Sequence, residues 1–152
     1  MRGDPEMLRL DDFLPYRLSF TSNLVSGQVA TAYEAVFGLR IPEWRLIAVI
    51  AEARQATQQE IGRRTRMDKV TVSRAATSLV ERGVLKRGEH PGDRRSHLLS
   101  LTPDGERLYD EIAPLAKDYE RRLFTALSDE ERQTLVALLA KIDSAALAME
   151  SG

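Results

Sequence analysis

The chain has 152 residues, of which 43% are hydrophobic, and a net charge of −1, which fits one domain or two small lobes that share a core. It contains no cysteine, and this excludes disulfides, thiolate metal sites and a cysteine-based redox sensor. The sequence has neither an apolar run of about 18 residues nor the apolar segment of a signal peptide, so we expect a soluble, cytoplasmic protein that contacts no membrane.

Two helices are predicted in the first third of the chain. Asp11 or Asp12 can cap a helix whose apolar residues recur near the helical period as far as Phe37. Gly38 suits the end of that helix, and Pro42 suits the first position of the next one.

The next pair of helices has clear start and stop signals. Thr57–Glu60 forms a capping box at the start of a short helix that ends near Thr65. Asp68 then caps a helix over Lys69–Arg82, and Gly83 occupies the position where a left-handed residue ends it. Two helices separated by so short a turn indicate a helix-turn-helix.

After Gly83 the spacing of apolar residues changes from the helical period to that of strands. Val84–Glu89 and Ser96–Leu101 are predicted as two short strands, joined by a turn over His90–Arg95. Thr102 begins a long helix, and the capping box Ser128–Glu131 begins the last one. The sequence therefore predicts a mainly α fold with a small β-hairpin wing, which is a winged helix-turn-helix.

Basic side chains are concentrated in this middle segment. Residues 63–95 hold ten Lys or Arg and four Asp or Glu, a net charge of +6, so the rest of the chain carries −7. This asymmetry is typical of an element that faces phosphates. An arginine-rich but merely solvated surface is the alternative interpretation.

The Lys69–Arg82 helix has two different faces on a helical wheel. Its buried face is predicted to hold Val72, Ala75, Ala76, Leu79 and Val80. The opposite face holds small or hydrogen-bonding side chains with one arginine, namely Val70, Ser73, Arg74, Thr77, Ser78 and, at one edge, Thr71. Short hydroxyl side chains and an arginine suit a helix that lies close to base edges in the major groove, where a valine can contact a thymine methyl group.

Four runs of residues together carry a family resemblance. Asp68–Arg74, Leu79–Arg87, Asp93–Arg95 and Leu99–Gly105 follow one another in the order and at the spacings of the MarR family of transcriptional regulators, which the chain resembles. The resemblance implies a homodimer in which the first, fifth and sixth helices interlock, with two recognition helices in successive major grooves of a palindromic operator.

The resemblance also assigns roles to parts of the chain. It implies an N-terminal dimerisation helix over residues 1–38, a DNA-binding lobe over 39–102 and C-terminal dimerisation helices over 103–152. Thr71, Ser73 and Arg74 match base-reading positions, and Arg95 matches a wing-tip arginine. Together with the wheel and the charge pattern, this predicts double-stranded DNA as the partner, contacted by Lys69, Val70, Thr71, Ser73, Arg74, Thr77, Arg87, Arg94 and Arg95.

A small-molecule effector is a further expectation. Some members of the family sense oxidants through a reactive cysteine, which this chain lacks, and others respond to small aromatic acids or related compounds in a cleft between the dimerisation and DNA-binding lobes. An arginine in an otherwise apolar helix can hold a carboxylate, so Arg17 is of interest, although it can instead pair with an acid across the dimer or face water. The candidate cleft residues are Tyr16, Arg17, Phe20, Asn23 and Trp44.

An enzyme is not expected. The two histidines, His90 and His97, both fall in the wing, and no nucleophile–base arrangement, phosphate-binding loop or paired carboxylates stand out. With only Glu89 and Asp93 near them, the histidines make a poor metal site, so no metal and no cofactor are expected. The favoured function is a repressor that leaves its operator on binding a small aromatic or carboxylate ligand, and a winged helix that binds proteins without reading DNA sequence remains the alternative.

Overall fold

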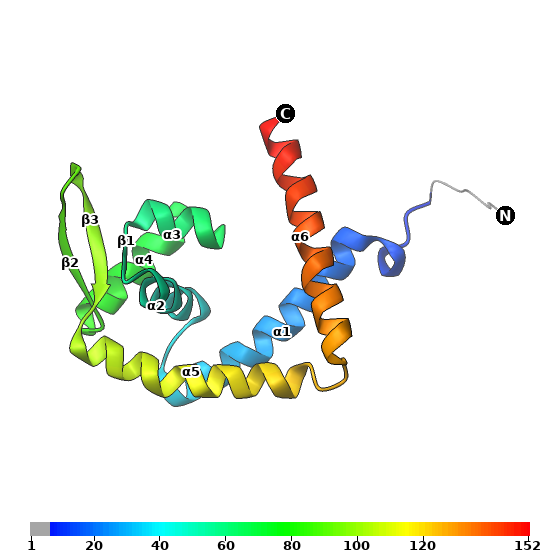
Figure 1. Ribbon diagram of the computed structural model, residues 1–152, viewed down its shortest axis with the longest axis horizontal. Helices are drawn as coiled ribbons and strands as arrows, with labels where there is room; N and C mark the ends of the chain where they lie inside the picture. The colour runs from blue at the N-terminus through cyan, green and yellow to red at the C-terminus, as the bar shows by residue number, and fades with distance from the viewer. Residues whose placement is uncertain (1–6) are drawn as a thin grey trace. The chain divides into compact units, whose positions relative to one another are not determined.

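Six helices and three short strands make up the computed structural model, which describes residues 7–152 apart from the side chain of Arg94. The helices and strands follow the predicted order and confirm a mainly α, winged-helix fold (Figure 1). The helices are α1 (Leu14–Phe37), α2 (Ile41–Ala53), α3 (Gln58–Thr65), α4 (Lys69–Glu81), α5 (Pro103–Leu123) and α6 (Asp129–Ser151). The strands are β1 (Gln55–Ala56), β2 (Leu85–His90) and β3 (Asp93–Leu101).

The chain divides into two compact units that meet at the Ala113–Pro114 bond, inside α5. The expected division at residues 38 and 102 concerns the roles of dimerisation and DNA binding, not compact units, and it stays a prediction. Over residues 7–152, no helix combines the length and the apolar character that crossing a membrane requires.

The core of the first unit lies between α2, α3, α4 and the sheet. Each large apolar side chain that is fully buried there stabilises the fold by about 1.5–3 kcal/mol. Four of the five side chains predicted on the buried face of α4 are buried, and the fifth, Val80, is half-buried. The fully buried side chains include Leu46, Ile47, Ile50, Ile61, Leu79 and Leu99.

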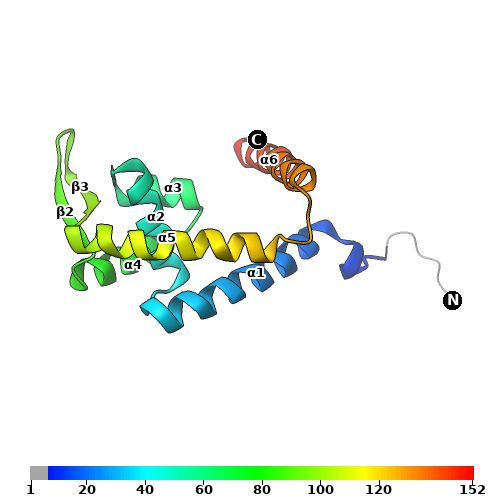
Figure 2. The same cartoon turned by 60° about the horizontal axis from the view of Figure 1, so that its bottom comes forward.

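The sheet is antiparallel with strand order β1-β3-β2. The β2–β3 hairpin projects beyond α2, α3 and α4, as Figures 1 and 2 show. The sequence did not predict β1, in which Gln55 pairs with Ser100 and Ala56 with Leu99, because two residues are too few to show a strand period.

Most helix starts follow the local signals, but the first does not. Thr57 and Ser128 form the predicted capping boxes, and Asp68 accepts the Thr71 amide at 2.7 Å. The expected cap at Asp11 or Asp12 is wrong, because both lie in a 3-10 turn (Leu10–Asp12) and Phe13 precedes α1 without a side-chain cap.

The start of α5 is fastened to the turn between α4 and β2. The Thr102 hydroxyl donates to the carbonyl of Gly83 at 2.5 Å and accepts the amide of Gly105 at 3.0 Å. A side chain at Gly105 would overlap the carbonyl oxygen of Val84. Thr102 and Gly105 therefore allow the start of α5 to approach the backbone of Val84 closely.

The second unit consists of the end of α5 and α6. Arg132 donates two hydrogen bonds to the carbonyl of Phe124, at 3.2 and 2.8 Å, and thereby ties α6 to the preceding turn. None of residues 114–152 is buried. The exposed apolar side chains of α6 are Leu135, Val136, Leu138, Leu139, Ile142, Leu147 and Met149.

Candidate nucleic-acid interface

A short turn joins α3 to α4. Arg66 ends α3 in the left-handed region (φ 62°), where its amide donates to the carbonyl of Gly62 at 2.9 Å. Two residues later Asp68 caps α4. The turn leaves one face of α4 packed on the core and the other turned outward.

The outward face of α4 is as small and polar as the wheel predicts. Ser73, Arg74 and Thr77 are exposed, and Val70 keeps 57% of its surface accessible. An apolar side chain this exposed on a DNA-facing helix can contact a thymine methyl group.

Thr71 lies at the edge of this face and takes part in the helix cap. Its hydroxyl donates to Asp68 at 3.0 Å and its amide donates at 2.7 Å. The amide and then the hydroxyl are the largest causes that lower the pKa of Asp68 below its ordinary value. Because the hydroxyl proton is already used, Thr71 can meet a base only through an oxygen lone pair or its methyl group.

Ser78 does not belong to the outward face, contrary to the wheel. Its hydroxyl donates to Oε2 of Glu43 on α2 at 2.7 Å. Glu43 is 7% exposed, and its other oxygen accepts the amide of Arg40 at 2.9 Å. Ser78 therefore joins α4 to the start of α2.

The wing has a bulge near its tip. Glu89 pairs with His97, but the next residue of β2, His90, pairs with Asp93, so β3 carries three extra residues, 94–96. The predicted six-residue turn is thereby shortened to Pro91–Gly92. A bulge bends its strand and redirects the side chains that it carries.

Asp93 organises this bulge through the backbone. It accepts the Arg95 amide at 2.9 Å and the Ser96 hydroxyl at 3.1 Å. The Arg95 amide, followed by Ser96, lowers the pKa of Asp93 below its ordinary value. These hydrogen bonds fix the position of the Arg95 backbone. The side chain of Arg94 lies outside the described residues.

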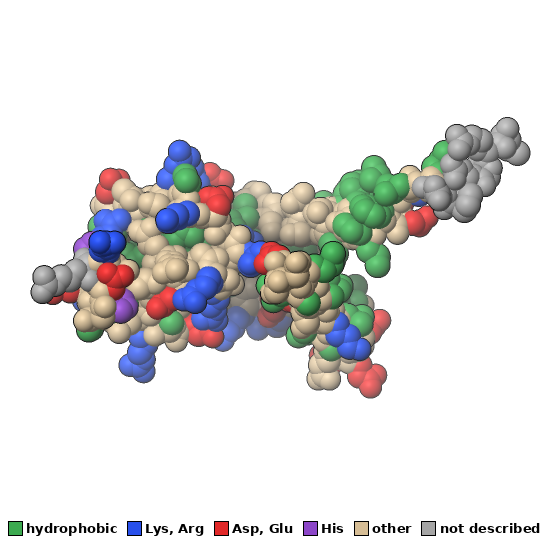
Figure 3. All heavy atoms as spheres, turned by 90° about the horizontal axis from the view of Figure 1, so that it is seen from above, with side chains coloured by type: hydrophobic (Ala, Val, Ile, Leu, Met, Phe, Trp, Pro, Cys, Tyr) green, Lys and Arg blue, Asp and Glu red, His purple; other side chains and the backbone are tan. Residues whose placement is uncertain are grey.

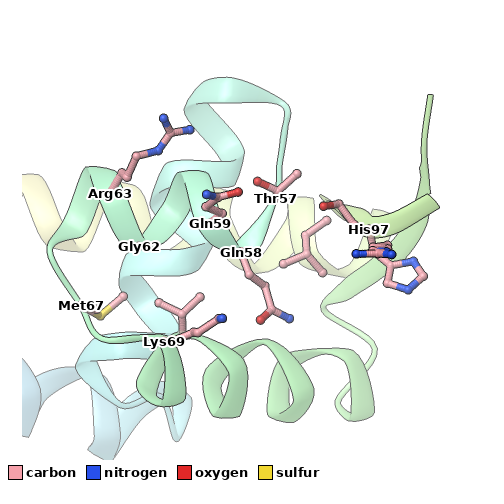
Figure 4. Close-up of a pocket in the computed structure, with 12 residues that line it drawn as sticks. Thr57, Gln58, Gln59, Gly62, Arg63, Met67, Lys69 and His97 are labelled. Atoms are coloured by element: carbon pink, nitrogen blue, oxygen red, sulfur yellow. The ribbon is translucent and has the colours of Figure 1, made fainter. Parts of the chain in front are cut away.

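The other predicted DNA contacts lie between α4 and the wing. The guanidinium of Arg87 on β2 lies 3.4 Å from the hydroxyl of Thr77 on α4. Lys69 and Arg95 line the same cavity, of about 580 Å³, between α3, α4 and β3 (Figure 4). The structure thus brings α4 and the wing together.

The predicted effector residues divide into two places. Tyr16 and Phe20 are neighbours on α1, with ring centres 6.1 Å apart, and the exposed Arg17 lies 5.5 Å from the centre of the Phe20 ring. Asn23 is exposed one turn further along α1.

Trp44 lies in a different aromatic cluster. Its ring is 5.5 Å from Tyr33 and stacks on Tyr109 at 6.2 Å. Tyr16 and Tyr33 lie at opposite ends of α1, about 25 Å apart at the helical rise of about 1.5 Å per residue. Trp44 and the Tyr16 cluster therefore form no common pocket within one chain.

Sequence reasoning did not name three arginines and a glutamine near α4 as site residues. Arg40 and Arg82 line a second cavity, of about 520 Å³, together with Arg74. Arg82 donates to the carbonyls of Gly38 and Phe37 at 3.1 and 3.0 Å, so it also holds the end of α1. Arg63 and Gln58 line the first cavity. Arg82 directly follows α4 in the chain, whereas only tertiary packing places Arg40, Arg63 and Gln58 beside α4. Within residues 7–152, no group of three or more His, Asp or Glu side chains is arranged to hold a metal.

Comparison with known proteins agrees with this geometry. The model of the MarR family matches residues 37–96, which span α2, the helix-turn-helix and most of the wing. A MarR/EmrR family transcriptional regulator from Acinetobacter sp. ADP1 is 27% identical and superposes with a TM-score of 0.85, covering 91% of this chain and 98% of that one. The chain belongs to the MarR family of transcriptional regulators.

Other members of the MarR family extend this comparison. The transcriptional regulator BilQ of Clostridium symbiosum is 28% identical over 86 residues, 57% of this chain, and the match spans only 60% of the length of BilQ. A MarR variant from E. coli, solved in complex with operator DNA, is 23% identical with a TM-score of 0.78, covering 90% of this chain and 99% of that one. At this identity the E. coli structure supports the fold alone.

Proposed function

We propose that this MarR-family regulator is a homodimeric repressor that recognises a palindromic operator in duplex DNA. The observation that carries the proposal is the outward face of α4, where Ser73, Arg74 and Thr77 are exposed beside the wing that carries Arg95. A repressor of this kind acts by covering the promoter so that polymerase cannot bind.

The same face argues against a winged helix that binds only proteins. A protein-binding face is centred on large apolar or aromatic anchors. The outward face of α4 offers one valine and short hydroxyl side chains, within a segment of net charge +6. DNA is the partner that this chemistry fits.

The predicted contacts have distinct roles in this proposal. Arg74 and Ser73 read base edges, with Arg74 suited to a guanine, and Val70 packs on a thymine methyl group. Lys69 and Arg87 hold phosphates, and Arg95 reaches the minor groove next to the half-site. Thr71, Thr77 and Arg94 remain proposed contacts on the same grounds.

The homodimer is proposed from surfaces that a single chain leaves uncovered. The N-terminal half of α1 exposes Leu14, Leu18, Phe20 and Leu24, and the whole of α6 exposes its apolar residues. Figure 3 shows hydrophobic side chains along the segment that leads to the N-terminus. A second copy can cover equivalent faces of both chains at once through a two-fold interface. The dimer then presents two recognition helices to half-sites about 34–36 Å apart.

An effector is part of the proposal. A small aromatic or carboxylate compound that binds only a dimer with a different spacing of recognition helices would release the operator. The candidate residues remain Tyr16, Arg17, Phe20, Asn23 and Trp44. Because one chain keeps Trp44 apart from the others, a shared site would need the second copy.

Selection of binding sites from a random duplex library, at about 150 mM salt, tests the function. We expect an inverted repeat with half-site centres about 10 bp apart. Recovery of no motif, with weak binding that salt abolishes, would reject sequence-specific reading and favour the protein-binding alternative. A monomer in sedimentation at micromolar concentration would reject the dimer.

Arg74→Ala tests the assigned surface. We expect it to weaken operator binding by about 1–3 kcal/mol and to relax the preference at one base pair of each half-site. Arg107→Ala, which removes an exposed arginine that pairs with Asp104 on α5, is the matched control and should bind as the parent does. Equal affinities for the two variants at fixed salt would mean that the assigned surface is wrong.

A further inference from the structure

The hydroxyl group of Thr71 has a fixed polarity. It lies 3.0 Å from one oxygen of the Asp68 carboxylate, and the other oxygen of that carboxylate accepts the Thr71 amide at 2.7 Å. An ionised carboxylate accepts hydrogen bonds and has no proton to donate. The hydroxyl group therefore donates its only proton to Asp68, and its oxygen is left with lone pairs that accept.

Asp68 is held in its ionised form. The pKa of its carboxyl group is lowered first by the Thr71 amide, then by the Thr71 hydroxyl, and least by the positive charge of Arg74. Asp68 also caps α4, so the start of the helix fixes its position. At neutral pH the hydroxyl group cannot turn its proton outward without losing a charge-assisted hydrogen bond.

The oxygen of this hydroxyl group is available to a partner. Thr71 is half-buried, and among the described side chains none donates a hydrogen bond to its hydroxyl oxygen. Arg74 follows three residues later, which makes the two side chains neighbours on the helix surface, and both line the cavity of about 520 Å³ beside α4. A base that meets Thr71 therefore lies next to the guanine proposed for Arg74.

The four bases differ in what they offer to an acceptor in the major groove. Cytosine and adenine present an amino group there, whereas guanine presents two acceptors and thymine presents one acceptor and a methyl group. An acceptor on the protein pairs with the amino group and is repelled by the acceptors. Adenine is the weaker match of the two amino-bearing bases, because its N7 acceptor lies beside its amino group.

We infer that Thr71, which Asp68 holds as a hydrogen-bond acceptor, selects an amino-bearing base, cytosine ahead of adenine, at the base pair next to the one that Arg74 reads. Thr71 is the specificity-determining residue, and Asp68 acts through it as a positioning residue. The inference rests on the proposed function, because it requires α4 to enter the major groove.

Base preference in a set of variants tests the inference. Binding sites are selected from a random duplex library at about 150 mM salt with the full-length parent and four variants, and Kd is then measured on duplexes that differ at one base pair. Thr71→Val keeps the methyl group and should reduce the preference for cytosine at one base pair of each half-site by roughly two- to tenfold, the effect of one hydrogen bond. Thr71→Ser keeps the hydroxyl group and should retain the preference.

Asp68→Asn should reverse the polarity. The oxygen of the asparagine can accept the Thr71 amide and preserve the cap, while its amino group donates to the hydroxyl oxygen and releases the hydroxyl proton. The preference at the same base pair should then shift toward guanine or thymine, whose edges accept a hydrogen bond. If Asp68 had only a structural role, this variant would weaken binding to every duplex alike, and that result would overturn the inference.

Thr77→Val is the matched control on the same helix. The Thr77 hydroxyl accepts a hydrogen bond from the Arg87 guanidinium at 3.4 Å, so its proton is not held by a carboxylate. Its loss should leave the preference at the Thr71 base pair unchanged. If Thr71→Val and Thr77→Val change the same base pair alike, the assignment to Thr71 is wrong.

The outcome in the parent separates this inference from the proposed function. A selected palindrome without a preference for cytosine or adenine at any base pair that depends on Thr71 would overturn the inference alone. A Thr71-dependent preference for thymine would do the same, because it would indicate a contact through the methyl group. If the parent selects no motif, the proposed function fails and the inference fails with it.

Discussion

The hydrogen bond between Ser78 and Glu43 predicts a specific loss of stability. Glu43 is a buried carboxylate with two partners, the Arg40 amide and the Ser78 hydroxyl. Ser78→Ala removes one of them and leaves an acceptor of a charged group unpaired in the interior. A hydrogen bond to a charged group contributes about 1.5–3 kcal/mol, so the variant should lose about this much free energy of unfolding.

Ser73→Ala is the matched control, because it makes the same change on the same helix at an exposed residue. The gain in helix propensity is common to both variants. The difference between their free energies of unfolding therefore isolates the hydrogen bond. The assay is urea unfolding followed by circular dichroism at one protomer concentration, and the difference corresponds to a Tm shift of roughly 3–12 °C.

A double-mutant cycle with Glu43→Gln checks the reasoning further. With a neutral amide at position 43, the additional cost of Ser78→Ala should fall to about that of a neutral hydrogen bond, 1.5 kcal/mol or less. If Ser78→Ala is no more destabilising than Ser73→Ala, the bond contributes nothing and the argument from Glu43 burial is refuted. Ser73→Ala should in turn weaken operator binding, which Ser78→Ala affects only through stability.

Three further predictions concern close packing, capping and the core. Gly105→Ala should destabilise the fold by about 1–3 kcal/mol, because a Cβ there overlaps the Val84 carbonyl, whereas Gly62→Ala meets only ordinary contacts and should be neutral or stabilising in thermal unfolding. The pKa of Asp68 is lowered, so its contribution to stability is complete above the ordinary pKa of an aspartate and is lost as pH falls through the lowered pKa. Asp68→Asn should cap α4 equally well, but a profile of Tm against pH should then lack this acid dependence. Leu79→Ala should lower the free energy of unfolding in urea by about 2–5 kcal/mol, and Val70→Ala by about 0.5 kcal/mol or less. Similar losses in the two variants would mean that the two faces of α4 are wrongly assigned.

The features that the sequence predicted well are those set by near neighbours in the chain. The capping boxes at Thr57 and Ser128 and the cap at Asp68 depend on residues three positions apart, and all three form. The two faces of α4 follow from the helical period, since a residue's direction depends only on its position along the helix.

The features that it missed depend on distant partners. The helical wheel placed Ser78 on the outward face of α4, and only its hydrogen bond to a buried carboxylate 35 residues away turns it inward. The bulge on β3 depends on the two hydrogen bonds of Asp93 and on register with β2. The cavity beside Lys69 exists because β3 packs against α3, and no local pattern encodes that contact.

The absence of a buried side chain in residues 114–152 has a consequence for gene dosage. In the proposed dimer, a segment that buries nothing by itself gains its stability from association, so the proportion of complete regulator depends on how much protein is present. Below the dissociation constant of the proposed dimer, the concentration of DNA-binding units varies with the square of the protomer concentration. A twofold fall in expression would then reduce these units about fourfold, so the strength of repression would be especially sensitive to synthesis rate when the protein is scarce.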